Sequence, residues 1–322
     1  MKAHKHRKTG RSLLLLLLVS LASATAQINA QETDAPDLNI QRADVGDTPW
    51  GITFDGANIW VANNGDNTAT KLRRSDGAML GTFPVGGKPI GATFDGDNIW
   101  ITNSGDDTVT KLRASDGVTQ GTFGVGGLPV GIAFDGENIW VANAEDDTVT
   151  KLRANDGLVL GTFSVGDVPR SVLFDGTYLW VTNALDGTVT KLQTDGTVVG
   201  VFRAGALPEG IVFDGIYIWV TNGSSPNEHV TKLRTSNGQR IGSYTVDEGA
   251  ANLAFDGTYI WVTNTARREV TRLYARTGLR HDTIRVGEGP LGILYDGTSM
   301  WITNSVTNDV CRISRSSDDI LR

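Results

Sequence analysis

The chain has 322 residues with a formal net charge of −7, 39 glycines, one cysteine and an apolar fraction of 39%. This acidic balance argues against a nucleic-acid partner or an anionic membrane surface, since both need a basic protein face. A single cysteine excludes an intramolecular disulfide scaffold and a multi-cysteine zinc site, and the many glycines favour turn-rich β structure over a helical bundle.

The N-terminus has the three-part pattern of a secretory signal peptide. Residues 2–11 carry five basic side chains and no acid, an apolar run follows from Leu13 to Leu21, and Ala24-Thr25-Ala26 offers a small-x-small cleavage site. The run is too short to span a bilayer, although an uncleaved membrane anchor is the alternative. We therefore expect residues 1–26 to be removed, leaving an exported chain of net charge −12 that is periplasmic or secreted and not inserted in a membrane.

A unit of about 40 residues repeats seven times in the rest of the chain. Each unit contains an Asp-Gly pair, then Ile-Trp-Val or a close variant, and an asparagine three residues after the tryptophan. The tryptophans are Trp60, Trp100, Trp140, Trp180, Trp219, Trp261 and Trp301, and the asparagines are Asn63, Asn103, Asn143, Asn183, Asn222, Asn264 and Asn304. The repeats predict one domain over residues 38–315, preceded by a linker (27–37) and followed by a short tail (316–322).

Each unit contains four short strand patterns. In the second unit they cover residues 90–94, 98–102, 108–113 and 120–125, with turns at Asp95-Gly96 and Asp116-Gly117. No segment shows a helical apolar period. Seven sets of four antiparallel strands predict an all-β fold, a seven-bladed β-propeller.

Several repeated residues have an expected role within this fold. Glycines such as Gly51, Gly91 and Gly131 lie on the predicted innermost strand, where blades crowd together and a side chain would clash. The repeated tryptophans are expected to pack between blades. A basic residue repeats in the third strand and is expected to stabilise the blade; its members are Lys71, Lys111, Lys151, Lys191, Lys232, Arg272 and Arg312.

The two ends of the chain predict how the ring closes. The chain ends soon after the third strand of the seventh unit, residues 309–313, while residues 39–46 align with fourth strands such as residues 280–287. The N-terminal strand is therefore expected to complete the last blade, which leaves no open blade at the seam. Cys311 replaces a third-strand threonine and is expected to be buried, with a reactive thiol as the alternative.

The pattern Pro-x-Gly-Ile-x-Phe-Asp-Gly-x-x-Ile-Trp-Val-x-Asn, followed by Thr-Val-Thr-Lys-Leu, resembles the YVTN-type bacterial propeller repeats. It is also similar to the wider group that contains the streptogramin (virginiamycin B) lyases. The resemblance covers residues 38–315 and implies the propeller fold. It implies little about function, because propellers include both enzymes and binding platforms.

Candidate binding residues are those that break the repeat near the central channel. The residue after the Pro position differs in every unit, and among these Arg170 and Glu209 are charged and Trp50 is aromatic. Arg170 and Glu209 are expected on adjacent blades, where they could hold a polar or zwitterionic ligand against Trp50. The alternative is that the two charged side chains pair with each other at a solvated rim.

A second region of the sequence is a candidate for contact with a partner. The fifth unit is two residues longer and contains Glu228 and His229, while the sixth contains Arg267 and Arg268. This irregular, mixed-charge sector is the expected partner contact. The loops after the asparagines are acidic in the early units, at Asp66, Asp106, Asp107, Glu145, Asp146, Asp147 and Asp186. They suit ordinary turns, although Ca²⁺ or Mg²⁺ binding there is the alternative; no cofactor is predicted.

The resemblance also permits a test of lyase chemistry. The streptogramin lyases have a histidine after the proline of Pro-x-Gly and a glutamate at the asparagine position, and their site binds Mg²⁺. Here the first position never holds histidine and the second is asparagine seven times. His281 and His229 are the mature chain's histidines, and no catalytic residue is predicted.

The leading hypothesis is an exported, non-catalytic propeller. It would bind an unidentified protein, glycan or small ligand at its asymmetric rim and would be a monomer. A streptogramin-lyase-like or other divalent-metal-dependent lyase or hydrolase is the alternative.

Overall fold

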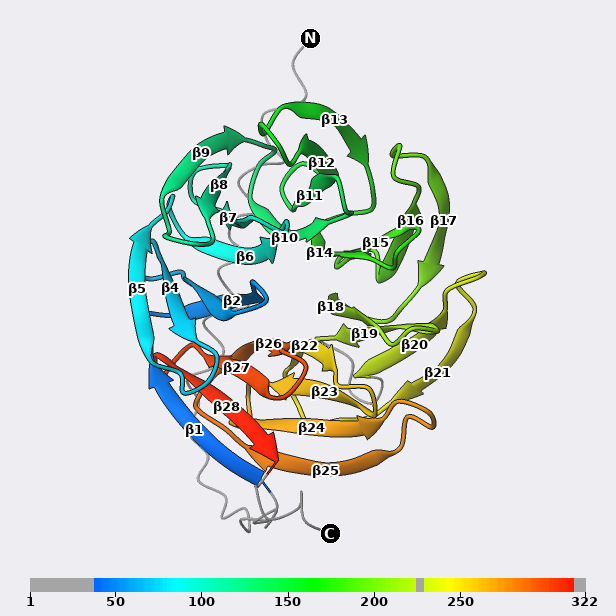
Figure 1. Ribbon diagram of the computed structural model, residues 1–322. Helices are drawn as coiled ribbons and strands as arrows, with labels where there is room; N and C mark the ends of the chain where they lie inside the picture. The colour runs from blue at the N-terminus through cyan, green and yellow to red at the C-terminus, as the bar shows by residue number, and fades with distance from the viewer. Residues whose placement is uncertain (1–37, 224–228, 316–322) are drawn as a thin grey trace.

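The computed structural model describes residues 38–223 and 229–315, and these form 28 strands in seven four-stranded antiparallel sheets. The sheets are arranged radially around one axis as the blades of a propeller (Figure 1). The predicted seven-bladed, all-β fold is confirmed. No helix in the described ranges is long and apolar enough to cross a membrane.

Blades 1 to 6 each run outward from the axis in chain order, and blade 7 combines the two ends of the chain. The innermost strands are β2 (Pro49–Phe54), β6 (Pro89–Phe94), β10 (Pro129–Phe134), β14 (Pro169–Phe174), β18 (Pro208–Phe213), β22 (Ala250–Phe255) and β26 (Pro290–Tyr295). The second strands are β3 (Asn58–Asn63), β7 (Asn98–Asn103), β11 (Asn138–Asn143), β15 (Leu179–Asn183), β19 (Tyr217–Asn222), β23 (Tyr259–Asn264) and β27 (Met300–Asn304). The third strands are β4 (Thr68–Arg73), β8 (Thr108–Arg113), β12 (Thr148–Arg153), β16 (Thr188–Leu192), β20 (Val230–Arg234), β24 (Glu269–Tyr274) and β28 (Asp309–Arg315). The outer strands are β5 (Met79–Pro84), β9 (Thr119–Gly124), β13 (Val159–Ser164), β17 (Val198–Arg203), β21 (Arg240–Tyr244), β25 (Arg280–Arg285) and β1 (Leu38–Asp44).

The predicted strand positions in blade 2 agree with the structure to within one residue at each end. The outer strand β9 ends at Gly124 rather than Val125, because the amide of Val125 instead donates to the carbonyl of Asp107 in the neighbouring loop. This bond ties the end of each outer strand to the loop between the second and third strands, and Val85 and Val165 repeat it.

The ring closes through strand β1, as predicted. β1 pairs with β28 over its full length, from Leu38 opposite Arg315 to Asp44 opposite Asp309, and Figure 1 shows the blue β1 beside the red β28. Cys311 lies on β28 and is fully buried, as expected, and burial raises the pKa of its thiol. The predicted signal peptide, linker and tail lie outside the described residues.

The core is divided among the interfaces between blades, and the repeated tryptophans are its largest members. Trp60 of blade 1 packs against Ile99 and Ile101 of blade 2 and is completely buried. Its indole Nε1 donates to Asp55 at 2.8 Å, and an equivalent bond occurs in all seven blades. The Asp-Gly turn thus satisfies the one polar atom of a buried tryptophan, which removes the cost of burying it.

The repeated lysines stabilise contacts between blades, as expected. Lys71 lies 5.2 Å above the Trp60 ring, and its Nζ donates to the carbonyls of Ala114 at 2.7 Å and Ser115 at 3.1 Å in blade 2. The Nζ atoms of the other four lysines likewise donate to a backbone carbonyl of the next blade. Each lysine therefore joins a cation–π contact to an inter-blade hydrogen bond.

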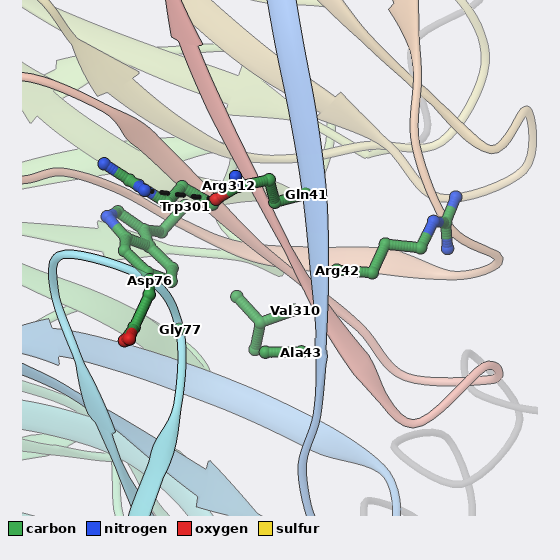
Figure 2. A pocket seen from close by; sticks show the side chains of 8 residues that line it. All are labelled: Gln41, Arg42, Ala43, Asp76, Gly77, Trp301, Val310 and Arg312. Carbon is green, nitrogen blue, oxygen red and sulfur yellow. Dashed lines mark hydrogen bonds between the residues drawn. The ribbon is translucent and has the colours of Figure 1, made fainter.

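The seam between blades 7 and 1 differs from the regular interfaces. In blade 1 the ring of Phe83 lies over Gly117 of blade 2, where an added Cβ would come within 2.1 Å of it. At the seam the equivalent residue is Ala43, which lies with Gly77 and Trp301 around a shallow depression too small to hold a water molecule (Figure 2). The missing ring weakens the packing at this interface.

Two arginines compensate at the same seam. Arg312 donates to the carbonyl of Ser75 at 2.7 Å and to Gln41 at 3.1 Å, the contact drawn in Figure 2. The Arg74 guanidinium donates to the side-chain carboxylate of Asp296 at 3.0 Å and to the backbone carbonyl of Asp296 at 2.8 Å. Together with bonds from Trp301 and two backbone amides, Arg74 lowers the pKa of Asp296 to about 2, against the effect of burial.

Candidate functional site

The residues that break the repeat lie where the seven innermost strands begin, around the axis. We use the term axial ring for the residues that follow the Pro position: Trp50, Ile90, Val130, Arg170, Glu209, Ala251 and Leu291. Neighbouring inner strands contact one another around the whole ring. The seven residues thus begin adjacent strands of one closed ring, although they are about 40 residues apart in sequence.

Crowding at the axis explains the inner-strand glycines. A Cβ on Gly51 would lie 2.2 Å from the Ile90 carbonyl oxygen of the next blade, and one on Gly91 would lie 2.4 Å from that of Val130. The predicted reason for these glycines is therefore confirmed. Two blades nevertheless carry a polar residue at this position, Ser171 and Asn252.

A threonine on the second strand positions the axial-ring backbone in five blades. Thr182 Oγ1 accepts from the amide of Ser171 at 3.0 Å and donates to the carbonyl of Glu209 at 2.8 Å. Thr102, Thr221, Thr263 and Thr303 make the same pair of bonds, whereas blades 1 and 3 have alanine. One hydroxyl thus links the backbones beside Arg170 and Glu209, and fixes the two residues close together.

Arg170 and Glu209 are charged side chains that make no ion pair among the described residues. Within the described residues no ion pair of 4.0 Å or less joins them to each other or to another group, so the direct pairing considered as an alternative is absent. The Nε atom of Arg170 is inaccessible and has no hydrogen-bond partner in the described chain. Burial raises the pKa of Glu209, and the nearby charge of Arg170 opposes that rise only in part.

Trp50 lies on the opposite side of the axis. Figure 1 shows β2, which carries Trp50, across the axis from β14 and β18, which carry Arg170 and Glu209. It is the one tryptophan of eight outside the repeated position, and it is partly exposed while the other seven are buried. The expectation that Trp50 stacks on a ligand held by Arg170 and Glu209 stays a prediction.

The polar and apolar residues of the axis fall into two sectors. Blades 4 to 6 carry Arg170, Ser171, Glu209 and Asn252, which we call the polar sector. The Asn252 carboxamide oxygen lies 2.9 Å from where a Cβ of Gly210 would stand, and so beside the strand of Glu209. Blades 7 and 1 to 3 carry the apolar sector, which consists of Leu291, Trp50, Ile90 and Val130. Val130 is buried in a cluster with Ala144 and Val168.

Sequence reasoning missed Ser171, Asn252 and the threonine links. The signal for the first two was present, since they replace the glycine of Pro-x-Gly in blades 4 and 6. The threonines occupy the variable position of Trp-Val-x-Asn. A variable position in a repeat can thus carry either structural or functional information, and only the contacts separate the two.

The acidic loops are occupied by backbone hydrogen bonds. The carboxylates of Asp106 and Asp146 accept from the amides of Gly87 and Gly127 at 2.5 Å and 2.7 Å, and Asp66 and Asp186 act in the same way. This is the turn-forming role that the sequence favoured. The described residues contain no group of three or more side chains that suits a metal ion. Ca²⁺ or Mg²⁺ binding at these loops was the alternative to turns, and it stays untested.

The predicted partner contact is not one continuous set of exposed side chains. Arg267 and Arg268 are half exposed and pair with Glu248 at 3.5 Å and Glu288 at 2.7 Å. His229 is buried, and its Nδ1 lies 2.5 Å from the carbonyl oxygen and 3.2 Å from the amide nitrogen of Val246. Glu228 lies outside the described residues. Of this group, only the two arginines are placed where a partner can reach them.

The positions that resemble lyase catalytic residues do not provide acid–base groups. The seven repeated asparagines are completely buried; Asn63, for example, donates to Thr68 and Thr70 at 3.0 Å and 2.9 Å. His281 lies on the outer strand β25, as expected, and stacks on Tyr259 with ring centroids 4.8 Å apart. The seven asparagines and His281 are not members of the axial ring.

The fold and the axial ring define this protein as a seven-bladed β-propeller with an asymmetric set of residues at its axis. No family model and no curated protein sequence matches the chain. Solved propellers are similar in structure. A streptogramin B lyase has a TM-score of 0.74 at 19% identity, and the match covers 87% of this chain and 99% of the lyase.

Two further structures match equally well. Hydrazine synthase of Kuenenia stuttgartiensis has a TM-score of 0.74 at 20% identity, over 90% of this chain and 99% of the other. A catalytically inactive virginiamycin B lyase from Staphylococcus aureus, with quinupristin, has a TM-score of 0.74 at 18% identity, over 86% and 99%. At such identities the similarity establishes the shared fold and leaves the activity open.

Proposed function

We propose that this protein is an exported, non-catalytic β-propeller that binds a ligand at the axial ring. One observation carries the proposal: the Nε atom of Arg170 is buried without a hydrogen-bond partner, and Arg170 and Glu209, on adjacent blades, form no ion pair within the described residues. All other blades have an uncharged residue at this position. The two charges are thus peculiar to the ring and are not part of the repeated packing.

The energetic cost of these side chains supports a role in binding. A buried polar group without a hydrogen-bond partner destabilises a fold by about 1–3 kcal/mol, and a charged group by more. Apolar residues at the same position in the other five blades avoid that cost. A ligand that supplies the missing partners would recover the lost interactions on binding, which is how desolvated polar groups give specificity.

The N-terminal sequence supports export. Residues 1–26 carry the pattern of a cleaved signal peptide, and we propose that the mature chain is periplasmic or secreted and monomeric. The repeat motif supports assignment to the YVTN-type propellers. N-terminal sequencing of the exported protein tests the first point: a start at Gln27 agrees with the proposal, and retention of Met1 contradicts it.

A lyase is the second candidate, and the structural similarity to streptogramin lyases is the observation that favours it. The residues of this chain do not supply the histidine and glutamate of that group. Incubating the mature protein with quinupristin and Mg²⁺ tests this candidate directly. Ring opening of the substrate at a rate above that of buffer would favour the lyase over the binding scaffold.

The binding proposal is tested with variants of the axial ring. Arg170→Gln and Glu209→Gln are screened by thermal shift against a library of small polar metabolites and glycans, beside the wild-type mature chain. A ligand of the wild-type protein raises its melting temperature, and both variants are expected to lose that shift. Matched controls are Arg113→Gln and Glu137→Gln, which change exposed side chains far from the axis. Equal shifts in all five proteins would place the ligand elsewhere.

A further inference from the structure

We propose that the axial ring binds a free α-amino acid with an apolar side chain, its carboxylate held by Arg170 and its ammonium group by Glu209. This inference rests on the proposed binding function and specifies the class of ligand. It uses three features of the ring: the sign of the two charges, their closeness, and the apolar residues across the axis.

The ring requires a ligand with two opposite charges. Arg170 has a buried Nε donor without an acceptor, and a carboxylate is the group that a guanidinium binds in two-point fashion. Glu209 is a partly exposed carboxyl group, burial raises its pKa, and no described residue donates to it. An ammonium group would both donate to it and favour its ionised form. A ligand with one of the two charges would leave the other side chain unpaired.

The two charges of the ligand must also lie close together. The amide of Ser171, next to Arg170, and the carbonyl of Glu209 both lie within 3.0 Å of the same Thr182 hydroxyl oxygen. The two side chains therefore leave the backbone from neighbouring points on adjacent strands. In a free α-amino acid a single carbon carries both charged groups, whereas a peptide separates its terminal charges by at least one residue.

Further polar groups lie beside the same two residues. Ser171 and Asn252 replace glycine in blades 4 and 6, immediately next to the strand of Glu209 on its two sides. A hydroxyl and a carboxamide can each donate and accept hydrogen bonds. An ammonium group has three donors and a carboxylate has two acceptor oxygens, so Glu209 and Arg170 alone do not use all of them. The polar sector provides the remaining partners.

The apolar sector selects the rest of the ligand. Trp50, Leu291 and Ile90 occupy the three blades farthest from the charged pair and are partly exposed. A side chain that extends from the charged carbon across the axis meets this sector. Leucine or phenylalanine would bury apolar surface there, while glycine would bury none. Trp50 offers a flat ring for stacking with an aromatic side chain.

Isothermal titration calorimetry of the full mature protein tests the inference with defined probes. L-Phenylalanine is compared with 3-phenylpropanoate, which lacks the ammonium group, with phenethylamine, which lacks the carboxylate, and with glycine, which lacks the side chain. We expect L-phenylalanine or L-leucine to bind at least about tenfold more tightly than each of these three probes. Each probe lacks one group of the ligand, and so leaves Glu209, Arg170 or the apolar sector without its contact.

Variants connect the preference to the residues. In Glu209→Gln the affinity for L-phenylalanine should fall to about that for 3-phenylpropanoate, which itself should change little. In Arg170→Gln the affinity should fall to about that for phenethylamine. Trp50→Leu should lower the affinity for L-phenylalanine more than the affinity for L-leucine. Equal loss for all probes in Glu209→Gln would overturn the assignment of Glu209 to the ammonium group.

The possible failures are distinguishable. If the four probes bind no better than one another, or not at all, the amino-acid inference is wrong. The metabolite and glycan screen then decides the broader proposal: a ligand whose thermal shift depends on Arg170 or Glu209 keeps the axial site but assigns another ligand class. If no compound gives a shift sensitive to these residues, the proposed function fails as well.

Discussion

The interfaces between blades and the axial ring are built from the same seven repeats but use them differently. At the interfaces a tryptophan, an aspartate and a basic residue recur, and their contacts repeat: Trp60 donates to Asp55 and lies under Lys71, as Trp100 does with its equivalents. At the axial ring the seven residues differ in size, polarity and charge. Every polar atom of the repeated tryptophans has a partner, whereas Arg170 Nε has none among the described residues.

The difference indicates that stability and recognition are separated in this fold. Repeated residues satisfy one another, so changing them should affect unfolding before any other property. The charged residues of the ring are costly to the folded state, so changing them should leave stability unchanged or improve it. Two carboxyl groups express this contrast: Asp296 at the seam has a lowered pKa, and Glu209 at the ring has a raised one.

The largest expected effect is at an interface tryptophan. Trp140 is completely buried, packs against Val181 of the next blade and donates to Asp135 at 2.7 Å. Trp140→Ala should lower the free energy of unfolding by about 3–5 kcal/mol, because it leaves a large cavity. Denaturant unfolding of the mature chain measures this. Leu158→Ala, at an exposed position, is the control and should change stability by less than about 0.5 kcal/mol.

The seam carboxylate should make stability depend on acid. Since the pKa of Asp296 falls from 3.8 to about 2 on folding, its ionised form stabilises the protein by about 2 kcal/mol above pH 4, and this is lost as the pH falls through 2. Asp296→Asn should therefore be destabilised at pH 7, and the difference from wild type should shrink toward pH 2. A difference that is constant from pH 7 to pH 2 would contradict this role of the charge.

Glu209 should show the opposite sign. Because its pKa is raised on folding, the unfolded chain loses its proton first, and the ionised carboxylate destabilises the fold as the pH rises above about 4.5. Glu209→Gln should raise the melting temperature at pH 7 in the absence of ligand, and have little effect at pH 4. Melting temperatures of both proteins across this range measure the effect. A lower melting temperature of the variant at pH 7 would show that Glu209 stabilises the fold, as the repeated residues do.

The smallest effect is expected at Ala43, at the seam between blades 7 and 1. Ala43 stands over Gly77 where Phe83 and Phe123 place a ring over the equivalent glycines at regular interfaces. Ala43→Phe should place a ring over Gly77 and raise the free energy of unfolding by about 0.5–1 kcal/mol, since it buries apolar surface at the ring closure. A matched Ala78→Phe change, in the adjoining turn, should not stabilise the protein. Loss of stability in Ala43→Phe would show that the seam cannot accept the regular contact.

The sequence predicted what the repeats determine. Spacing alone located the blades, the closing strand β1 and the packing role of Trp60 and Lys71, because identical residues in identical surroundings report a shared contact. It also selected Arg170, Glu209 and Trp50 as the exceptions. It could not predict contacts between unlike units: the bond from Arg74 to Asp296 joins residues more than 200 positions apart.

Local variation was harder to interpret. His229 was expected on a contact surface, but its ring is buried and bonded to Val246, because it takes the position of the threonines that begin other third strands. Ser171 and Asn252 were hidden in a motif whose glycine is otherwise explained by crowding. A single substitution within a repeat gives no sign of whether the neighbouring blade has adjusted to it.

The separation of stability and recognition is tested most directly by the double variant Arg170→Gln/Glu209→Gln. Its thermal unfolding at pH 7 is compared with that of the wild-type mature chain, with and without L-phenylalanine. The account predicts a melting temperature equal to or above that of wild type without ligand, and a ligand-induced rise in wild type alone. A fall of several degrees in the ligand-free variant would contradict it, because the two charges would then be part of the folded framework.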